Sequence, residues 1–425
     1  MGREILVISN GHGEDVIAVS IVKALREIPH IKKISALPLV GEGYAYKKAN
    51  IPVIGAVKTM PSGGFNQDIN QLRRDINDGL LILTYNQYLT IKEWAEKGGK
   101  ILAVGDILPL LLAWVGGGEF AFVATAKSEY YLRDEKGWLN STSLLDRWLG
   151  SMFFPWERWL MNRSHCRGVF VRDSLTAQIL RGFSIPVYDL GNPMMDSFSV
   201  QPSLTFPSEE ETLIILLLPG SRMPEAQYNW QLILQAVENI KQAFSQRSLL
   251  FLAAITPSFN SIPFQEDLIE GGWQKKANNK QNLPLGDDEA ILFTHNQTDL
   301  ILSQQAYGSC LQFSHVGIAM AGTATEQFVG LGKPVISFPG KGPQFTRKFA
   351  QNQTRLLGCS FTLVDTPQEV GHTLKELMDN PKQLEKIVEN GQKRLGAPGA
   401  AQRIAHCLFD RCFKVKNHLN PNSDH

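Results

Sequence analysis

Short apolar runs alternate with helix-patterned segments along most of this 425-residue chain, and no other feature constrains its fold as strongly. An apolar run of about four to eight residues between turn signals is typical of a strand buried on both faces. Strands that alternate with helices form a parallel sheet with helices on both sides. The first series of expected strands covers residues 4–9, 34–40, 51–54, 80–83, 101–104, 120–124 and 168–171. The sequence therefore predicts an α/β fold with doubly wound, Rossmann-like domains.

The alternation occurs in two series, which predicts two such domains with a cleft between them. The second series covers residues 213–218, 249–255, 291–294, 316–320, 335–338 and 361–364. Residues 197–212 contain two prolines and little periodicity, as linkers do. We therefore expect an N-terminal domain at 1–196, a linker at 197–212 and a second domain at 213–396. A helix at 397–413 is expected to pack back on the first domain, before a polar tail at 414–425.

Composition argues against several functional classes. The 42 Lys and Arg residues balance 41 Asp and Glu residues, so the chain has no overall positive field for nucleic acid. Five scattered cysteines without a Cys-x-x-Cys motif favour free thiols in a reducing cytosol over disulfides or a zinc site. The sequence opens without a basic-then-apolar leader, and its longest apolar runs are about half the roughly 20 residues of a spanning helix. A cytoplasmic protein is expected.

The strand expected at 316–320 is followed by the turn Ala321-Gly-Thr-Ala-Thr-Glu-Gln327. The start of a helix leaves backbone N–H groups unpaired and carries partial positive charge, so it can hold an anion such as a diphosphate. Thr323 followed by Glu326 also fits a capping box, in which Glu326 only fixes the helix start. The turn therefore predicts an anion site, but its own residues do not specify the anion.

The first strand of the same domain ends in a turn of similar character, Pro219-Gly-Ser-Arg222. The guanidinium of Arg222 is suited to a bidentate contact with a diphosphate. The alternative is an exposed arginine paired with Glu225. Because a parallel sheet places both turns at one edge, the sequence favours a shared ligand over the alternative.

The first turn of the chain, Asn10-Gly-His-Gly-Glu-Asp15, argues against a dinucleotide. It lacks the third glycine of the dinucleotide fingerprint, and no acidic residue ends the next expected strand. Glu14 and Asp15 would also repel a phosphate. Walker, nucleophile-elbow and His-Glu-x-x-His motifs are missing, so the kinase-like NTPase, α/β-hydrolase and zincin classes lack their defining residues.

Two motifs of the second domain, Leu-Pro-Gly-Ser-Arg at 218–222 and Gly-Thr-Ala-Thr at 322–325, resemble lipid-A-disaccharide synthase, a GT-B glycosyltransferase that uses a UDP-sugar. Gly-Asn-Pro-Met-Met-Asp at 191–196 is similar to this family's Gly-His-x-Met-x-Asp. Gly-Ala-Ala-Gln-Arg-Ile-Ala at 399–405 is common in GT-B chains. The resemblance is stronger in the C-terminal half and is greatest to the related family found mainly in cyanobacteria.

The resemblance implies which residues bind the donor. They would be Gly220, Ser221, Arg222, Gly322, Thr323, Ala324, Thr325, Glu326 and Gln327. The family has a glutamate, taken to grip the ribose hydroxyls, seven residues before a strand-opening proline, and here that position is Gln327. Glutamine can still hydrogen-bond a diol, but only as a neutral partner. The resemblance also implies transfer without a metal or cofactor, with the UDP-sugar as co-substrate.

A general base in the N-terminal domain is implied as well. The family's aspartate follows a Val-Gly-Ile-type strand end, and Asp106 is the match, one residue short of the family spacing. Its other role would be to cap the segment that follows. His12 is the alternative base, because imidazole exchanges protons near neutral pH, unless it only orders its turn. The expected acceptor-side residues are Gly11, Gly13, Glu14, Asp15 and Asn192.

Residues 144–160 combine aromatic with basic side chains. The aromatic residues are Trp148, Phe153, Phe154, Trp156 and Trp159, and Arg147, Arg158 and Arg163 lie beside them. Such a mixture resembles a segment that lies in a membrane interface. Aromatic side chains buried between helices give the same pattern. An interfacial segment would suit a lipid or lipid-linked acceptor at the inner face of a membrane.

Three functional classes remain. The first is an inverting glycosyltransferase that moves a GlcNAc-type sugar from a UDP-sugar to a lipid acceptor. The second is a UDP-GlcNAc 2-epimerase-like isomerase, which shares the architecture but needs further acid and base residues. The third is a non-catalytic nucleotide-sugar or lipid-binding protein, favoured by Gln327 and by the spacing of Asp106.

Overall fold

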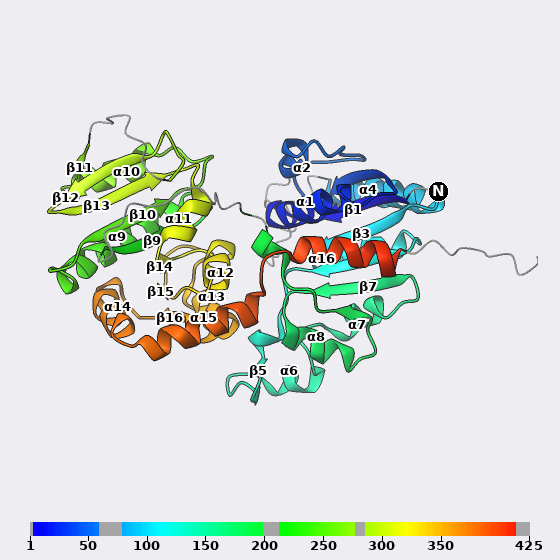
Figure 1. Ribbon diagram of the computed structural model, residues 1–425. Helices are drawn as coiled ribbons and strands as arrows, with labels where there is room; N and C mark the ends of the chain where they lie inside the picture. The colour runs from blue at the N-terminus through cyan, green and yellow to red at the C-terminus, as the bar shows by residue number, and fades with distance from the viewer. Residues whose placement is uncertain (1–2, 59–78, 197, 199–211, 277–284, 414–425) are drawn as a thin grey trace, which may run out of the picture. The chain divides into compact units, whose positions relative to one another are not determined.

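The computed structural model describes residues 3–58, 79–196, 198, 212–276 and 285–413 (Figure 1). The chain divides into two compact units. Unit 1 comprises Met1–Ser197 and Pro398–His425, and unit 2 comprises Phe198–Ala397. Each unit is a mainly parallel sheet with helices between its strands, so the predicted α/β fold class is confirmed.

Unit 1 contains a six-stranded parallel sheet in the order β2-β1-β3-β4-β7-β8. The strands are β1 (Arg3–Ser9), β2 (Ile31–Pro38), β3 (Lys100–Gly105), β4 (Phe120–Ala124), β7 (Cys166–Val171) and β8 (Val187–Tyr188), and β5 (Arg133–Asp134) with β6 (Gly137–Trp138) forms a separate hairpin. The central strand β4 is buried at every residue, which explains why its sequence is a continuous apolar run.

The helices of unit 1 pack on this sheet around a core of aliphatic and aromatic side chains. They are α1 (His12–Arg26), α2 (Tyr44–Lys48), α4 (Leu80–Glu96), α5 (Ile107–Val115), α6 (Leu144–Leu149), α7 (Pro155–Met161), α8 (Ser174–Arg181) and α16 (Ala400–Cys407), with 3-10 turns at Glu129–Tyr131 and Pro193–Asp196 and a π-helix at Leu408–Cys412. Phe120, Phe122 and Phe153 are among its largest fully or nearly fully buried side chains.

The helix α16 follows unit 2 in the sequence but packs on α1 of unit 1 (Figure 1). Its start is held by Asp196, whose carboxylate accepts the backbone N–H of Gly399 at 2.5 Å and of Ala401 at 2.7 Å. A carboxylate at this place also interacts favourably with the positive end of the helix dipole. The last helix is therefore an integral part of the first unit.

Unit 2 contains an eight-stranded sheet in the order β11-β12-β13-β10-β9-β14-β15-β16. The strands are β9 (Leu213–Leu218), β10 (Leu249–Ala254), β11 (Gln274–Lys275), β12 (Ile291–His295), β13 (Thr298–Ser303), β14 (Val316–Ala319), β15 (Val335–Ser337) and β16 (Phe361–Leu363). The helices are α9 (Glu225–Ala243), α10 (Ile262–Glu270), α11 (Tyr307–Phe313), α12 (Thr323–Gly330), α13 (Arg347–Leu357), α14 (Val370–Met378) and α15 (Pro381–Leu395), with 3-10 turns at Gly358–Ser360 and Pro367–Glu369. The buried face of α9 (Trp230, Ile233, Val237) packs in the core.

Two expected strands of unit 1 are not strands. Residues 80–83 form the first turn of α4, whose buried positions Leu83, Gln87, Ile91 and Trp94 recur at helical spacing. A four-residue apolar window is too short to separate a strand from a helix, which is why this prediction is wrong. Residues 51–54 contribute only one isolated bridge, between Val53 and Ala36.

The strand β13 is absent from the sequence-based prediction, although it lies inside the sheet of unit 2 between β10 and β12. It pairs antiparallel with β12, and the two are joined by Asn296 and Gln297, which both have positive φ angles. Two such residues form the tight turn that matches the twist of a hairpin. The expected strand at 291–294 is therefore one arm of a hairpin and not part of the parallel series.

Candidate functional site

The sheet order gives each unit one topological switch point. In unit 2, β9 has β10 on one side and β14 on the other, so the chain first winds outward from β9 on one side and later continues from β14 on the opposite side. In unit 1, β1 lies in the same way between β2 and β3. Ligands of open α/β sheets bind outside the carboxyl ends of the strands at such points.

The two predicted donor turns meet at the switch point of unit 2. The backbone N–H of Met320, after β14, donates to the carbonyl of Leu218 at the end of β9 over 2.8 Å. Gly220 has a φ of 112°, and a Cβ atom there would lie 3.2 Å from the carbonyl oxygen of Met320. The turn that carries Ser221 and Arg222 therefore lies against the turn that leads into α12.

The helix α12 begins without a side-chain cap. Its N-cap residue is Gly322, and Thr323 is already the first helical residue, so the predicted Thr323–Glu326 capping box is not formed. Glu326 is buried and its backbone N–H donates to the carbonyl of Gly322. Thr325 is turned inward, since its hydroxyl donates to the carbonyl of Ala321. A glycine cap leaves the first N–H groups of the helix to be satisfied by water or by an anion.

Arg222 does not pair with Glu225, which was the alternative to a ligand role. The Glu225 carboxylate accepts the backbone N–H groups of Gln344 and Phe345, at 3.1 and 2.6 Å. Within the described residues, no ion pair or hydrogen bond engages the guanidinium of Arg222, which is exposed beside Ser221. The cation at this turn is therefore available to a ligand.

A third loop, which follows β15, reaches the same switch point and was not predicted. Asn229 of α9 donates to the carbonyl of Pro219 at 2.9 Å, and a Cβ atom on Gly340 would lie 2.9 Å from the Asn229 side-chain oxygen. The Glu225 carboxylate accepts the backbone N–H of Phe345 and so holds the far end of this loop. The sequence signal was Gly340-Lys-Gly342 directly after an apolar strand, but the holding residues come from a helix more than a hundred positions earlier.

Gln327 is buried within unit 2. Its side-chain oxygen accepts a hydrogen bond from the hydroxyl of Tyr307 at 2.6 Å. Both residues lie on helices that flank β14, one before it and one after it. The predicted ribose-gripping position is thus held by a contact between α11 and α12.

At the switch point of unit 1, the turn after β1 meets the turn after β3. The side-chain amide of Asn10 donates to Asp106 Oδ1 over 2.8 Å. The same oxygen accepts the backbone N–H of Leu108 at 3.0 Å, so Asp106 is the N-cap of α5. Its predicted alternative role as a cap is observed, and within the described residues no hydrogen bond reaches Oδ2. The second oxygen remains able to accept a proton.

The surroundings of Asp106 are rich in acidic groups. Burial, and to a smaller degree the nearby Asp106, raises the pKa of Glu14. Burial raises the pKa of Asp15 to about 7, although the Ser9 hydroxyl donates to its carboxylate at 2.6 Å. Ser9 is in turn bonded to the buried hydroxyl of Tyr46. Raised values mean that this cluster carries less negative charge at neutral pH than its composition indicates.

The other expected acceptor-side residues occupy structural positions around this turn. Gly11 is the N-cap of α1, and a Cβ atom there would lie 2.6 Å from the carboxylate of Glu14. His12 and Gly13 are exposed in the first turn of the same helix. Asn192 is buried and its side-chain oxygen accepts the backbone N–H of Met194 at 3.1 Å. Asn192 therefore fixes its own turn.

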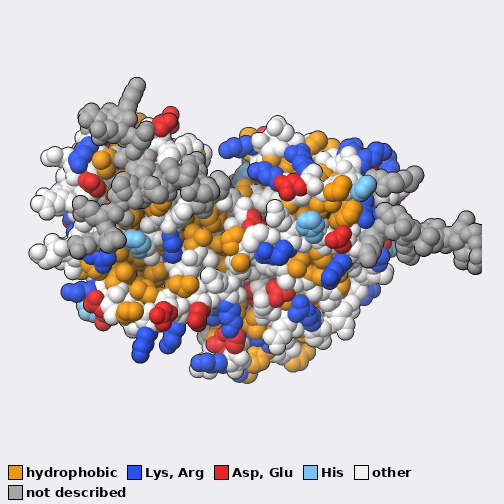
Figure 2. All heavy atoms as spheres, in the orientation of Figure 1, with side chains coloured by type: hydrophobic (Ala, Val, Ile, Leu, Met, Phe, Trp, Pro, Cys, Tyr) orange, Lys and Arg blue, Asp and Glu red, His pale blue; other side chains and the backbone are white. Residues whose placement is uncertain are grey.

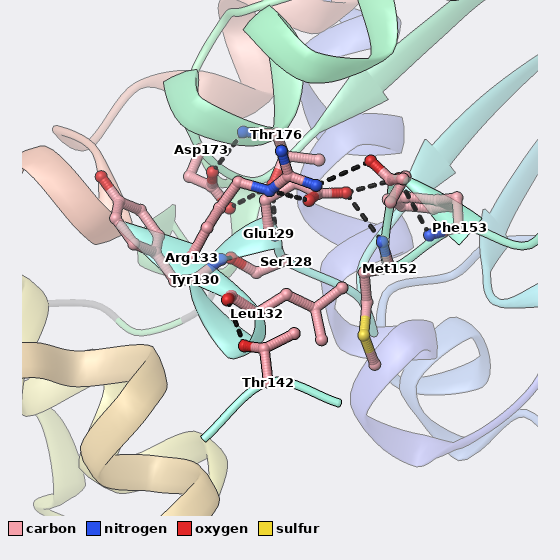
Figure 3. Close-up of polar contacts among 12 residues, drawn as sticks. Ser128, Glu129, Tyr130, Leu132, Arg133, Thr142, Met152, Phe153, Asp173 and Thr176 are labelled. Atoms are coloured by element: carbon pink, nitrogen blue, oxygen red, sulfur yellow. Dashed lines mark hydrogen bonds and ion pairs between the residues drawn. The ribbon is translucent and has the colours of Figure 1, made fainter. Parts of the chain in front are cut away.

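Two further carboxylates follow strands of the same sheet and contact neighbouring side chains and backbone groups (Figure 3). Glu129, after β4, accepts from Ser151 and from the backbone N–H of Met152, and it pairs with Arg133 at 2.9 Å. Asp173, after β7, caps α8 by accepting both the backbone N–H and the hydroxyl of Thr176. Both carboxylates are buried. Their contacts hold the loops of unit 1 together.

The aromatic segment of unit 1 is mostly exposed. None of the residues of α6 is buried, and Trp148 is 81% exposed. Trp156, Trp159 and Phe154 are also exposed. Phe153 is 2% exposed and belongs to the core, so it does not contribute to this surface. Figure 2 shows hydrophobic side chains on the surface at the lower end of this unit, where α6 lies in Figure 1.

Basic side chains accompany these rings. Arg163 lies over the ring of Trp159 at 4.1 Å, and Arg158 lies over Phe183 at 3.9 Å. Within the part of the chain that the structure describes, no helix is long and apolar enough to cross a membrane. The same residues include no group of three or more His, Cys, Asp or Glu side chains arranged to hold a metal ion.

Two doubly wound units in one chain are the architecture of the GT-B fold, and solved structures match nearly the whole chain. S. aureus MnaA in complex with UDP has 14% sequence identity and a TM-score of 0.57, with 96% of each chain covered. A UDP-GlcNAc 2-epimerase from Neisseria meningitidis bound to UDP-GlcNAc has 15% identity and a TM-score of 0.52, covering 95% of this chain and 99% of that one.

MurG of Acinetobacter baumannii is similar to the chain as well, with 10% identity, a TM-score of 0.53, and coverage of 95% of this chain and 98% of that one. No protein family matches the sequence in a scan of family profiles, and no curated protein matches it. Identities of 10% to 15% establish a shared fold and not a shared reaction.

Proposed function

We propose that the protein is a glycosyltransferase that moves a GlcNAc-type sugar from a UDP-sugar to a lipid or lipid-linked acceptor, without a metal or cofactor. The observation that carries the proposal is the meeting of two turns at the switch point of unit 2, where the turn that contains Arg222 lies against the turn that leads into the uncapped start of α12. The start of a helix supplies N–H donors and partial positive charge, and arginine supplies a bidentate fork. This combination suits a diphosphate.

The comparisons support a UDP-sugar as the donor. One similar structure contains UDP and another contains UDP-GlcNAc. In the proposed arrangement, Ser221 and Arg222 contact the diphosphate from one side and residues 322–325 contact it from the other. Glu326, in the first turn of α12, is buried.

The proposed reaction requires a base in unit 1. Asp106, whose Oδ2 is not hydrogen-bonded within the described residues, would take the proton of the acceptor hydroxyl, and His12 is the alternative base. The hydroxyl oxygen then forms a bond to the anomeric carbon while the bond to the UDP oxygen breaks, with inversion at that carbon. The negative charge that develops on UDP is stabilised by α12 and Arg222.

The exposed rings of α6 and α7 favour a lipid acceptor. Tryptophan and arginine side chains together are typical of segments that lie at a membrane surface. A protein that binds there would meet an acceptor anchored in the same surface. We therefore propose peripheral contact with a membrane through Trp148, Phe154, Trp156 and Trp159.

A UDP-GlcNAc 2-epimerase-like activity is the second candidate. It is favoured by the similarity to a 2-epimerase and by Glu14, which interacts with both Asp15 and Asp106, so that several carboxyl groups are available. It is disfavoured by Glu129 and Asp173, the carboxylates after β4 and β7, because structural contacts occupy both.

One experiment separates these activities from simple binding. The purified protein is incubated with UDP-GlcNAc, with and without a bacterial lipid extract, and UDP and sugar products are measured. A transferase releases UDP only when lipid is present, an epimerase forms ManNAc species without lipid, and a binding protein does neither. Arg222→Ala should abolish either reaction, while Arg347→Ala, which removes an exposed pair with Asp365, is the matched control. Turnover that is equal in the Arg222→Ala variant would contradict the proposed donor site.

A further inference from the structure

Asn10 links the two turns at the switch point of unit 1. It follows β1 directly, and its amide donates to Asp106, which follows β3 and lies 96 positions later. Asn10 is 8% exposed, so the contact is sheltered from water. Buried amide–carboxylate bonds are stronger than neutral ones because one partner is charged.

The neighbouring glycine makes this contact sterically feasible. Gly105 has a φ of 137°, and a Cβ atom there would lie 1.9 Å from the side-chain oxygen of Asn10. Any other residue at 105 would displace the amide of Asn10 or strain the backbone. The glycine at the end of β3 therefore leaves the space that the Asn10 side chain occupies.

The orientation of the amide is determined by Asp106. The side-chain oxygen of Asn10 is buried and has no hydrogen-bond partner within the described residues. If the amide were rotated by half a turn, this oxygen would face the Asp106 carboxylate and repel it. The observed orientation leaves Oδ1 of Asn10 unpaired, which costs free energy, but it allows the amide N–H to donate to Asp106.

We propose that Asn10 is the positioning residue for the base Asp106. Asn10 and the backbone N–H of Leu108 both bind Oδ1, which holds the carboxylate in one orientation and leaves Oδ2 to take the proton. This inference rests on the proposed function, in which Asp106 accepts the proton of the acceptor. In this role Asn10 acts through Asp106 and not by binding a substrate.

Substitution of Asn10 should lower kcat more than it changes KM. A general base contributes roughly 10²- to 10⁴-fold to a rate, and a misplaced group loses a large part of that. We expect Asn10→Ala to lower kcat by about 10- to 100-fold and to leave the KM for the UDP-sugar within about twofold, because the donor residues lie in unit 2. Asn10→Asp should lower kcat further, since it sets a like charge against Asp106.

Gly105→Ala tests the same geometry by another route, because its methyl group would displace the Asn10 amide. Asn390→Ala is the matched control. The Asn390 amide donates to the carbonyl of Leu357 and to Ser360 in unit 2, so its loss should lower stability without lowering kcat. If Asn10 had only a structural role, Asn10→Ala would likewise lower stability without lowering kcat.

Hydrogen exchange at the Leu108 amide gives a readout that does not depend on turnover. If Asn10 orients Asp106, the Leu108 N–H loses part of its protection in Asn10→Ala and keeps it in Asn390→Ala. The inference would be overturned if Leu108 exchange were unchanged in Asn10→Ala. It would also be overturned if Asp106→Asn inactivated the protein while Asn10→Ala kept kcat within twofold of wild type. A wild-type protein without transferase activity would instead reject the proposed function, and Leu108 exchange would still decide whether Asn10 positions Asp106.

Discussion

The hydroxyl of Tyr307 donates a hydrogen bond to the side-chain oxygen of Gln327 over 2.6 Å, which joins α11 to α12. Gln327 is 4% exposed, and burial raises the pKa of Tyr307, so the phenol stays protonated and remains a donor. A carboxylate at 327 would have to be buried against a neutral phenol. Glutamine accepts the same bond without the desolvation cost of a charge, which gives a physical reason for its presence at this position.

Gln327→Glu should therefore destabilise the protein above neutral pH. We expect the free energy of unfolding to fall by about 1–3 kcal/mol at pH 8 and to recover at pH 5, because a buried carboxyl has a raised pKa and is protonated there. Urea unfolding at the two pH values measures this. Equal stability of the variant and the wild type at pH 8 would show that the side chain at 327 reaches solvent or a cation.

Asp15 should make stability depend on pH. Burial raises its pKa from 3.8 to about 7, so the folded state binds more protons than the unfolded state between these values. Stability consequently falls as pH rises through this window and becomes level above it. The sign is opposite to that of a carboxylate in a favourable ion pair.

Asp15→Asn should remove this contribution. Relative to wild type, the variant should gain roughly 2–3 kcal/mol between pH 5 and pH 8, since one pKa unit corresponds to about 1.4 kcal/mol. Urea unfolding curves at pH 5, 6.5 and 8 give the difference. Subtracting the wild-type values cancels the titrating groups that do not interact with Asp15; Glu14, whose charge contributes to the raised pKa of Asp15, is not one of them. A difference that does not vary with pH would mean that Asp15 is ionised in the folded protein throughout.

Arg222→Lys should weaken UDP binding although it keeps the charge. Lysine lacks the planar fork that contacts two phosphate oxygens together, so we expect about a tenfold loss of affinity, and a larger loss for Arg222→Ala. Calorimetric titration with UDP measures both. Arg347→Ala should bind UDP as the wild type does, and an Arg222→Lys protein with wild-type affinity would exclude a bidentate contact.

Loss of the exposed tryptophans should weaken membrane binding. Trp148→Ala combined with Trp156→Ala removes two exposed rings from α6 and α7 without altering the core, unlike any substitution of Phe153. We expect the wild type to float with anionic vesicles and the double variant to bind about tenfold more weakly, with both losing affinity at high salt. Tyr228→Ala with Ile262→Ala, two exposed residues of unit 2, is the control. Equal flotation of all three proteins would contradict the proposed surface.

Most strands could be predicted from the sequence because buried parallel strands are continuous apolar runs, as β4 and β9 are. The failures have local causes. β13 contains Asp299 and only a short apolar stretch. Its residues form a strand through their hairpin pairing with β12, which the local pattern does not show. α4 begins with the same apolar run that a strand would have, and only the later Ile91 and Trp94 reveal its period.

One part of the candidate site could also be predicted from the sequence, and another part could not. The turns at Gly220 and Gly322 could be predicted, because each follows a strand directly and parallel strands end at one edge. The parts that were missed act through distant contacts. Asn10 acts on Asp106, and Glu225 acts on Phe345, 120 positions later. No periodicity or spacing in a single sequence encodes such pairs, whereas a hydrogen bond in the folded chain shows them directly.

The position of α16 has a consequence for how the chain is made. Unit 2 ends at Ala397, while unit 1 is completed only by the helix that begins at Ala400 and is capped by Asp196. The chain is synthesised from its amino end, so unit 1 cannot be completed by α16 until unit 2 has left the ribosome. The face of α1 that α16 covers stays open in that interval, so the order of completion is the reverse of the order of translation. A chain interrupted near residue 397 would hold a finished second unit and an unfinished first one.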